Sequence, residues 1–197
     1  MQADETALIN GVLKRDRRST ELLVERYKDK AMTLASRMLR NREDAEEAVQ
    51  DAFVRAIRSL PGFEMRSAFS TWFHRIVYNV CVSRLSKNSK EQAVDDLDDA
   101  SDSIASEDAL PDADYEATEV GAIISEEIEK LPSAYAATFT LFFVDEMSYR
   151  EIVEVTGLPI GTVKARLFRA RMIVRDAVAR RLGLRRESDS AVPEEIV

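Results

Sequence analysis

The sequence predicts an all-α protein made of two small helical domains joined by an acidic linker. Apolar residues recur at helical spacing in both halves of the 197-residue chain. Prolines, glycines and capping residues fall between these periodic stretches, where helices are expected to end. No stretch alternates apolar and polar residues as a half-buried strand would. Because 45% of the residues are apolar, each half can bury a core of its own.

The distribution of charge divides the chain into the same units. Residues 1–90 hold 17 basic and 12 acidic residues, whereas residues 91–119 hold 12 acidic residues and no basic one. Self-repulsion and a shortage of large apolar side chains make the second segment a flexible linker. An alternative is that it mimics nucleic acid and competes for a basic groove. Folded domains are therefore expected at residues 1–90 and 120–186, with a disordered tail at 187–197.

Three helices are expected in the first unit. The first ends near Asn41, which caps a second helix at residues 42–59, and Pro61 stops that helix. The third begins near Phe69 and continues to about Leu85. Apolar residues at helical spacing define the first and third helices: Leu22, Leu23, Tyr27, Leu34 and Met38, then Phe69, Trp72, Phe73, Ile76, Val77 and Val80. The first six residues of the chain are expected to fray.

The second unit is expected to contain four helices, of which the last two form a helix-turn-helix. A helix at residues 120–130 is followed by one from Pro132 to Phe143, since proline suits a first helical turn. Next, Ser148 and Glu151 form a capping box, which predicts the start of a short helix. Turn residues then end this helix and start the next: Gly157 and Pro159.

The helix after that turn has one apolar and one cationic face. The apolar stripe consists of Val163, Leu167, Ala170 and Val174. Opposite it lie Lys164, Ala165, Phe168 and Arg169, with Arg166 and Arg171 on the two flanks. This layout is typical of a helix that reads duplex DNA, with base contacts at its centre and phosphate contacts beside them. The net charge of −8 does not oppose this, because the local field governs contact with phosphates and residues 160–186 hold nine basic residues and one acidic.

Two surfaces of the first unit have alternative interpretations. The buried side of the 42–59 helix is predicted to consist of Ala45, Val49, Ala52, Phe53 and Ala56, with Asp44, Glu47, Gln50, Asp51 and Val54 opposite. Periodicity alone favours a solvated surface for this acidic face. The aromatic residues of the third helix match core spacing, so core packing is the default for them. However, Thr71, Trp72, Arg75 and Asn79 lie at or beyond the edge of its apolar stripe, where their chemistry suits unstacked bases.

Three stretches in this order resemble the extracytoplasmic-function (group IV) sigma factors of bacterial RNA polymerase. They are NREDAEEAVQDAFVRAIRSL, FSTWFHRIVYNVCVSRL and SYREIVEVTGLPIGTVKARLFRAR, within a resemblance that extends from about Leu8 to Leu184. The resemblance implies domains like sigma region 2 and sigma region 4. It also implies a cytoplasmic protein that binds core polymerase and directs promoter recognition and melting, in an envelope or stress response.

The resemblance assigns three sets of site residues. Those expected to dock on the clamp helices of the largest polymerase subunit are Asp44, Glu47, Gln50, Asp51 and Val54. Those expected at the minus-ten element are Arg66, Ser67, Thr71, Trp72, Arg75 and Asn79, of which Asn79 matches the contact to a flipped-out base. At the minus-thirty-five element, base edges would face Lys164, Ala165, Phe168 and Arg169, and phosphates would face Thr162, Arg166 and Arg171.

The chain departs from the family pattern at several of these positions. The loop reads Glu64-Met65-Arg66-Ser67 where the family often has a Gly-Asp pair before the serine, which changes the expected minus-ten preference. Ala165 stands where serine is common, leaving a methyl group that could touch thymine. Two further departures affect packing and charge: Val153 replaces a usual alanine in the turn, and Arg166 replaces a usual apolar residue.

An anti-sigma protein is a further partner that the resemblance implies, and the exposed apolar residues Val54 and Phe168 would serve it. No cofactor, metal, membrane insertion or obligate homo-oligomer is expected. Catalysis is disfavoured because the chain has no phosphate-binding glycine motif, and His74 and Cys81 are the only residues of their kinds. Cys81 is interpreted as a buried apolar residue rather than a redox sensor. The alternative function is a two-domain helix-turn-helix regulator that acts without docking on core polymerase.

Overall fold

The computed structural model describes residues 2–91 and 119–183, and this part of the chain is helical with no strand. Its helices run in chain order: α1 (Gln2–Leu13), α2 (Arg17–Leu39), α3 (Arg42–Ser59), the 3₁₀ turn η1 (Leu60–Gly62), α4 (Phe69–Glu91), α5 (Glu119–Glu129), α6 (Ser133–Phe143), α7 (Tyr149–Thr156) and α8 (Ile160–Arg181). The all-α prediction is confirmed. The predicted linker and tail lie mostly outside the described residues.

Side-chain caps fix where the helices of the first unit begin. The Asn41 side chain accepts a hydrogen bond from the amide of Asp44 at 3.0 Å and so caps α3 where the sequence predicted. Asp16 caps α2 in the same way through the amide of Ser19, at 2.8 Å. Between these helices, Arg40 adopts left-handed backbone angles, with φ of 56°, and turns the chain from α2 into α3. The α2–α3 corner is therefore determined by local residues.

Helix α1 was not predicted, and the expectation that residues 1–6 fray is wrong from Gln2 onward. Three apolar residues of α1 are buried against the rest of the first unit: Leu8, Ile9 and Val12. The helix lies close to α2, since a Cβ atom added to Gly11 would come within 2.0 Å of the Ser19 hydroxyl. Tertiary packing therefore supports a helix whose sequence lacks a clear amphipathic pattern.

An aromatic cluster joins α2, α3 and α4 at the centre of the first unit. The Phe53 and Phe73 rings lie with centroids 4.6 Å apart, and Tyr27 packs on both Phe69 and Phe73 at 5.1 and 5.8 Å. All four residues are buried, as their periodicity predicted. Leu22 is the exception among the predicted core residues of α2, because its side chain is exposed. It precedes Leu23 by one position and therefore points about 100° away from the core.

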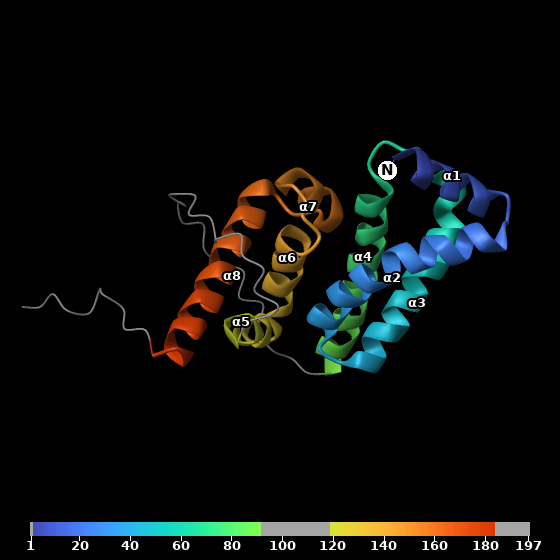
Figure 1. The fold of residues 1–197 in the computed structure, drawn as a ribbon. Helices are drawn as coiled ribbons and strands as arrows, with labels where there is room; N and C mark the ends of the chain where they lie inside the picture. Colours follow the sequence, from blue (N-terminus) through green and yellow to red (C-terminus); the bar gives the residue numbers. More distant parts are fainter. Residues whose placement is uncertain (1, 92–118, 184–197) are drawn as a thin grey trace, which may run out of the picture.

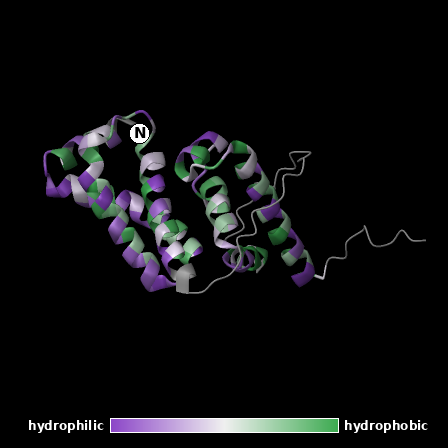
Figure 2. Ribbon diagram, turned by 180° about the vertical axis from the view of Figure 1, so that it is seen from behind, coloured by the Kyte–Doolittle hydropathy of each residue, from purple (hydrophilic) through white to green (hydrophobic). Residues whose placement is uncertain are grey.

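The second unit follows the predicted order of helices. Ser148 and Glu151 form the capping box at the start of α7, and Gly157 ends that helix with left-handed angles, at φ of 73°. Pro159 then occupies the N-cap position of α8. The four predicted stripe residues of α8 are buried: Val163, Leu167, Ala170 and Val174. Figure 2 shows hydrophilic and hydrophobic residues alternating along the same helices, as amphipathic segments require.

The two units lie side by side and share an apolar core (Figure 1). This cluster includes Val77 of α4 together with Leu141 of α6 and Ile152 of α7, all fully buried. The packing was not part of the sequence prediction, which described two domains on a tether and left their arrangement open. Figure 1 shows α2 and α4 facing α6 and α7, while α3 and α8 occupy the two outer sides of the molecule.

Polar contacts accompany the shared core along α2. The Ser133 hydroxyl donates to the carbonyl of Met38 at 2.8 Å, and the Arg37 guanidinium donates to the Thr140 hydroxyl at 3.2 Å. The guanidinium of Arg40 donates to backbone carbonyls at the end of α5, including that of Lys130 at 3.1 Å. A cation at this position satisfies carbonyls that a helix C-terminus leaves without intrahelical donors.

Candidate nucleic-acid and partner interface

The five residues predicted to dock on polymerase lie together on the outward face of α3. Four of them are exposed, namely Glu47, Gln50, Asp51 and Val54, and Asp44 is half-buried. The opposite face of α3 is buried as predicted, at Ala45, Val49, Ala52, Phe53 and Ala56. Val54, with 46% of its surface exposed, provides an apolar spot beside the acidic groups. The helix thus offers charge and apolar surface on one side.

A cation that sequence reasoning missed lies beside this acidic face. The Arg84 guanidinium of α4 lies 2.9 Å from a Glu47 carboxylate oxygen and 3.8 Å from one of Asp51. Arg84 thereby orients two acidic side chains and partly neutralises them. The sequence offers no signal for this contact because 37 positions separate Arg84 from Glu47. Only the packing of α4 against α3 brings them together.

The predicted minus-ten residues of α4 fall into two groups. Arg75 and Asn79 are exposed and lie one turn apart on the same helical face. Trp72 lies between this face and the core, where its ring packs on Phe63 at 4.9 Å and on Phe69 at 5.5 Å between centroids. It remains half-buried, as its position at the margin of the apolar stripe predicted. These three residues form a polar and aromatic edge.

Thr71 does not belong to this exposed edge in the observed arrangement. Only 2% of its surface is exposed, and its hydroxyl lies 3.3 Å from a carboxylate oxygen of Glu151 in α7. Hydrogen bonds from the Ser148 hydroxyl and amide hold the pKa of Glu151 below its usual range, so this carboxylate is charged at neutral pH. Thr71 can contact DNA only if the second unit moves away.

The loop before α4 carries the other two predicted minus-ten residues. Arg66 is largely exposed, and its guanidinium pairs with Glu64 at 2.6 Å, whereas Ser67 is half-buried. Met65, between Glu64 and Arg66, has a left-handed φ of 55°. This position lies where the family often has glycine and aspartate, so the backbone here takes a turn without the residue types that favour it.

Helix α8 presents the predicted cationic face on the outside of the second unit. Lys164 and Phe168 are exposed, the latter with 41% of its surface, and Ala165 and Arg169 are half-buried beside them. Lys164 also lies over the ring of Tyr149, 5.6 Å from its centroid. Two predicted phosphate ligands are half-buried at the margins, Thr162 and Arg171. The arrangement matches a helix that inserts one face into a groove.

Arg166 differs from the other cations of α8 because it faces the first unit. Burial raises the pKa of Tyr78 in α4, and the positive charge of the nearby Arg166 guanidinium partly opposes this rise. Arg166 is half-buried and lies near Tyr78, at the contact between the units. One member of each predicted DNA surface therefore lies against the other unit: Thr71 against Glu151, and Arg166 near Tyr78.

A buried pair between the units was also missed by sequence reasoning. His74 of α4 and Asp145, in the loop between α6 and α7, lie 3.2 Å apart, from Nε2 to Oδ2, and both side chains are 1% exposed. The sequence singled out His74 only as the sole histidine. Its place inside the apolar stripe between Phe73 and Val77 indicated burial but not its partner.

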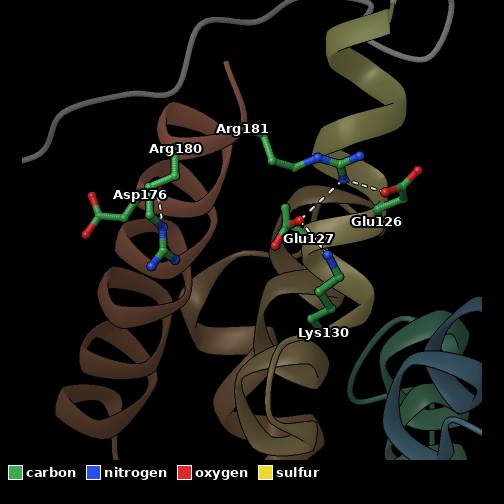
Figure 3. Close-up of polar contacts among 6 residues, drawn as sticks. All are labelled: Glu126, Glu127, Lys130, Asp176, Arg180 and Arg181. Atoms are coloured by element: carbon green, nitrogen blue, oxygen red, sulfur yellow. Dashed lines mark hydrogen bonds and ion pairs between the residues drawn. The ribbon is translucent and has the colours of Figure 1, made fainter. Parts of the chain in front are cut away.

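An ion-pair network joins α5 to the C-terminal end of α8 (Figure 3). Arg181, the last residue of α8, pairs with Glu126 and lies 3.4 Å from Glu127 of α5, and Glu127 also pairs with Lys130 at 2.6 Å. The hydrogen bond from Lys130 is the main cause that lowers the pKa of Glu127. These contacts hold α5 against the end of α8, away from the predicted DNA face.

Cys81 is fully buried in the first unit. Burial raises the pKa of its thiol to about 12, so the reactive thiolate is scarce at neutral pH. This supports the prediction of a structural residue over that of a redox sensor. Within the described residues, no cluster of histidine, cysteine and acidic side chains could hold a metal ion. No described helix combines the length and apolar character that a membrane span requires.

Comparison with known proteins relates both units to described families. The family model for sigma-70 region 2 matches residues 23–91, and that for sigma-70 region 4 matches residues 122–173. The chain is 34% identical to the ECF RNA polymerase sigma factor SigW of Bacillus subtilis over 85% of its own length and 92% of that protein. It is 33% identical to the ECF RNA polymerase sigma-E factor of Escherichia coli, over 90% and 95% of the two chains.

Two solved structures have a fold similar to that of this chain. The sigma factor RpoE of Bartonella quintana, in complex with the anti-sigma factor NepR, has a TM-score of 0.62 at 22% identity, over 84% of this chain and 98% of that one. CnrH, in complex with the cytosolic domain of CnrY, has a TM-score of 0.61 at 20% identity, over 90% and 98% of the chains. At these identities the likeness concerns the fold.

Proposed function

This chain belongs to the ECF RNA polymerase sigma factors, and from that premise we propose which of its surfaces contact polymerase and which read the promoter. As a sigma factor it binds core RNA polymerase and directs it to promoters to start transcription. We assign residues 1–90 to polymerase docking and minus-ten recognition, and residues 120–186 to minus-thirty-five recognition. The segment 91–119 joins the two.

The proposed polymerase surface is the outward face of α3. Glu47, Gln50 and Asp51 are exposed there beside the apolar Val54, with Asp44 at the margin. A face that combines charge with a central apolar residue can be steered electrostatically and then desolvated on contact. Arg84 contributes by holding Glu47 and Asp51 in fixed positions. This geometry favours docking over a merely solvated surface.

The proposed minus-ten surface is the exposed edge of α4 with the loop before it. Asn79 offers an amide that can hydrogen-bond a base, and Arg75 offers a guanidinium one turn away. Trp72 is already fixed by Phe63 and Phe69, so stacking a base on its open side costs little ordering of the side chain. Arg66, Ser67 and Thr71 complete the proposed set.

The proposed minus-thirty-five surface is the outer face of α8. Lys164, Ala165, Phe168 and Arg169 would face base edges in the major groove, with Thr162, Arg166 and Arg171 on phosphates. The buried stripe on the opposite side packs α8 against its own unit and so holds this face outward. Because all of these residues lie on one helix, the spacing between the proposed base and phosphate contacts is fixed.

The proposed mechanism is recruitment followed by capture of opened DNA, with no covalent chemistry in this chain. Unstacked minus-ten bases exist only in melted DNA, so a surface that binds them shifts the equilibrium toward melting. Unstacking a base costs a few kcal/mol, which stacking and hydrogen bonds in the protein offset. Core polymerase keeps the two units at the spacing of the promoter elements.

One observation carries these assignments: α3, α4 and α8 each bury an apolar face and expose a face of the chemistry that its proposed partner requires. The test is run-off transcription with core polymerase on a promoter library. We expect Asn79→Ala to relax base choice at the minus-ten element while leaving choice at the minus-thirty-five element unchanged. Lys87→Ala, an exposed change on the same helix, is the matched control.

Failure of the purified chain to bind core polymerase would contradict the docking assignment and favour a regulator that acts on DNA alone. If Asn79→Ala instead reduced transcription equally from every promoter, base recognition by this residue would be wrong.

We further propose that an anti-sigma protein controls the chain in the cytoplasm during an envelope or stress response. A sigma factor of similar fold, RpoE of Bartonella quintana, was solved in complex with the anti-sigma factor NepR. The exposed apolar residues Val54 and Phe168 provide surfaces on the proposed polymerase and DNA faces that a protein partner could cover.

A further inference from the structure

Tyr149, the first residue of α7, lies beside one of the proposed base contacts. The Nζ atom of Lys164, on α8, is over the Tyr149 ring at 5.6 Å from its centroid. An ammonium group over an aromatic face is attracted by the electron density of the ring. Lys164 is exposed on the proposed DNA face, whereas Tyr149 is half-buried. The ring is therefore a support for a cation that the proposed function places on the promoter.

The Tyr149 ring is itself held by aromatic side chains of α6. It stacks on Phe142, with centroids 5.1 Å apart and an angle of 23° between the two planes. Phe142 meets Phe143 edge-on at 4.9 Å, and Phe143 packs on the buried Phe139 at 4.4 Å. These contacts connect Tyr149 to the apolar cluster of the second unit, so the ring has little freedom to move.

The backbones that carry the two partners are fixed as well. The capping box of Ser148 and Glu151 defines the first turn of α7, to which Tyr149 belongs. Gly157, with left-handed angles, ends α7 and turns the chain toward α8. Next to Lys164, the side chain of Val163 is fully buried and holds the start of α8 against its unit. The contact between ring and ammonium thus joins two helices of fixed relative position.

Lys164 needs such a support more than its neighbour Arg169 does. An arginine guanidinium is a planar fork that matches a base edge in a defined orientation, whereas a lysine ammonium is a compact charge on a long flexible stem. A freely moving ammonium can donate to many acceptors along a groove and distinguishes poorly between them. Restricting its motion before binding lowers the ordering cost of one particular contact.

We propose that Tyr149 is a positioning residue for Lys164 and thereby helps to determine base choice at the minus-thirty-five element, an inference that rests on the proposed function of α8. The ring face attracts one side of the ammonium, and the N–H donors on the other side stay available to base acceptors. A cation–π contact at an exposed site contributes about two- to fivefold to an equilibrium constant. Tyr149 acts through Lys164 and itself contacts no base.

The first test measures base choice by polymerase holoenzyme on a promoter library that contains every base at each minus-thirty-five position. Lys164→Ala identifies the base pair that Lys164 contacts. Tyr149→Leu keeps an apolar side chain on Phe142 but removes the aromatic face. We expect it to reduce discrimination at that same base pair by about two- to fivefold, with little change at the others. Tyr149→Phe keeps the face and is the matched control, in which discrimination should be retained.

A double-mutant cycle shows whether Tyr149 acts through Lys164. In the Lys164→Ala background, Tyr149→Leu should change base choice no further, because the cation that the ring positions is absent. An equal effect of Tyr149→Leu in both backgrounds overturns the proposal. So does an equal loss in Tyr149→Phe, which would assign the effect to the hydroxyl, or a loss spread evenly over all base pairs.

The second test needs neither polymerase nor DNA. In the NMR spectrum of the free chain, the ring current of Tyr149 should move the ε-methylene protons of Lys164 to higher field than those of the exposed Lys87. The difference should disappear in Tyr149→Leu and remain in Tyr149→Phe, and the same spectra show whether each variant is folded. Absence of the shift in the unmodified chain overturns the positioning of Lys164.

The two tests distinguish failure of this inference from failure of the proposed function. If Lys164→Ala relaxes base choice but Tyr149→Leu does not, the positioning role alone is wrong. If the ring-current shift is present but Lys164→Ala leaves base choice unchanged, the assignment of Lys164 to a base edge is wrong, and the positioning role falls with it.

Discussion

The two helices proposed to contact DNA, α4 and α8, divide their surfaces differently between packing and recognition. Helix α8 packs on α5, α6 and α7 of its own unit, and most of its cationic face lies on the outside of the molecule, with Arg166 turned toward Tyr78 of α4. Helix α4 is packed on two sides, against α2 and α3 within its own unit and against α7 of the other. Only the edge with Arg75 and Asn79 remains exposed. The surface proposed to read duplex DNA is thus mostly on the outside of the free chain, whereas the helix proposed to capture bases is partly covered.

The largest expected effect is on the free energy of unfolding, and it distinguishes the buried face of α4 from its exposed edge. Phe73→Ala removes a fully buried ring from the aromatic cluster and should lower the free energy of unfolding by about 3–5 kcal/mol. Chemical denaturation measures it. Lys87→Ala, on the exposed side of α4, should change stability by less than about 0.5 kcal/mol. Equal losses would mean that α4 has no structural face distinct from its exposed one.

The next effect tests whether the exposed face of α8 reads sequence. Arg169→Ala should cost about 1–3 kcal/mol of binding to the preferred promoter and relax choice at one base pair, if the guanidinium bonds a base edge. Arg171→Ala should instead weaken all sequences about equally and lower the slope of log affinity against log salt by about one. Binding by polymerase holoenzyme at several salt concentrations distinguishes them. Identical patterns would contradict separate base and phosphate roles.

A smaller effect concerns α7, the helix that contacts both DNA-facing helices. Ser148→Ala removes the side-chain cap and should lower stability by about 1 kcal/mol. Thermal or chemical unfolding measures the loss. Because the same change frees Glu151, its contact with Thr71 should also weaken. Ser125→Ala, an exposed change in α5, is a matched control that should have little effect. A loss as small as that of the control would show that the cap is dispensable.

Low pH should weaken the capping box in the unmodified chain, because it protonates the Glu151 carboxylate that accepts hydrogen bonds from Ser148. The hydrogen bonds from Ser148 lower the pKa of Glu151 from an ordinary 4.5, so the charged form is favoured in the folded state. Its contribution is present above that ordinary pKa and disappears as pH falls through the lowered one. Glu151→Gln should therefore be less stable than the unmodified chain at pH 7, and the gap should narrow below pH 4.5. A gap independent of pH would contradict this.

The smallest effect is expected at the exposed C-terminal end of α8. Arg181→Ala breaks the contacts with Glu126 and Glu127 at the end of α8, far from its DNA face. Exposed ion pairs contribute little because water and salt screen them, so the midpoint of thermal unfolding should move less than in Phe73→Ala or Ser148→Ala. Promoter affinity should change no more than in Arg180→Ala, its neighbour. A large loss would mean that the α5–α8 contact positions the recognition face.

Much of the fold follows from local signals. The caps at Asn41 and Ser148, the turn at Gly157 and the apolar stripe of α8 were all predictable, because each acts within one or two helical turns. Helix α1 was not, since its support comes from packing on α2 rather than from its own sequence. Leu22 was misassigned because one position of helical rotation separates it from a buried neighbour.

The candidate surfaces were predictable to a similar extent. Periodicity placed the acidic face of α3, the edge of α4 and the cationic face of α8, and the resemblance to sigma factors gave them partners. The sequence did not predict which residues of these surfaces are accessible in the folded chain. Thr71 and Arg166 sit at helical positions suited to DNA contact, yet both are engaged between the units. Arg84 joined the α3 face from another helix.

Spacing, caps and motifs predicted the α-helices of the described residues except α1, most of their faces, and the family, because these are properties of neighbouring residues. Only the packing of whole helices brings the two units into one core and places His74 beside Asp145 inside it. Burial and long-range pairing depend on how whole helices pack, and no local pattern encodes the position of one packed helix relative to another. The sequence thus determines the chemistry of each surface, and the fold determines which of its residues are accessible.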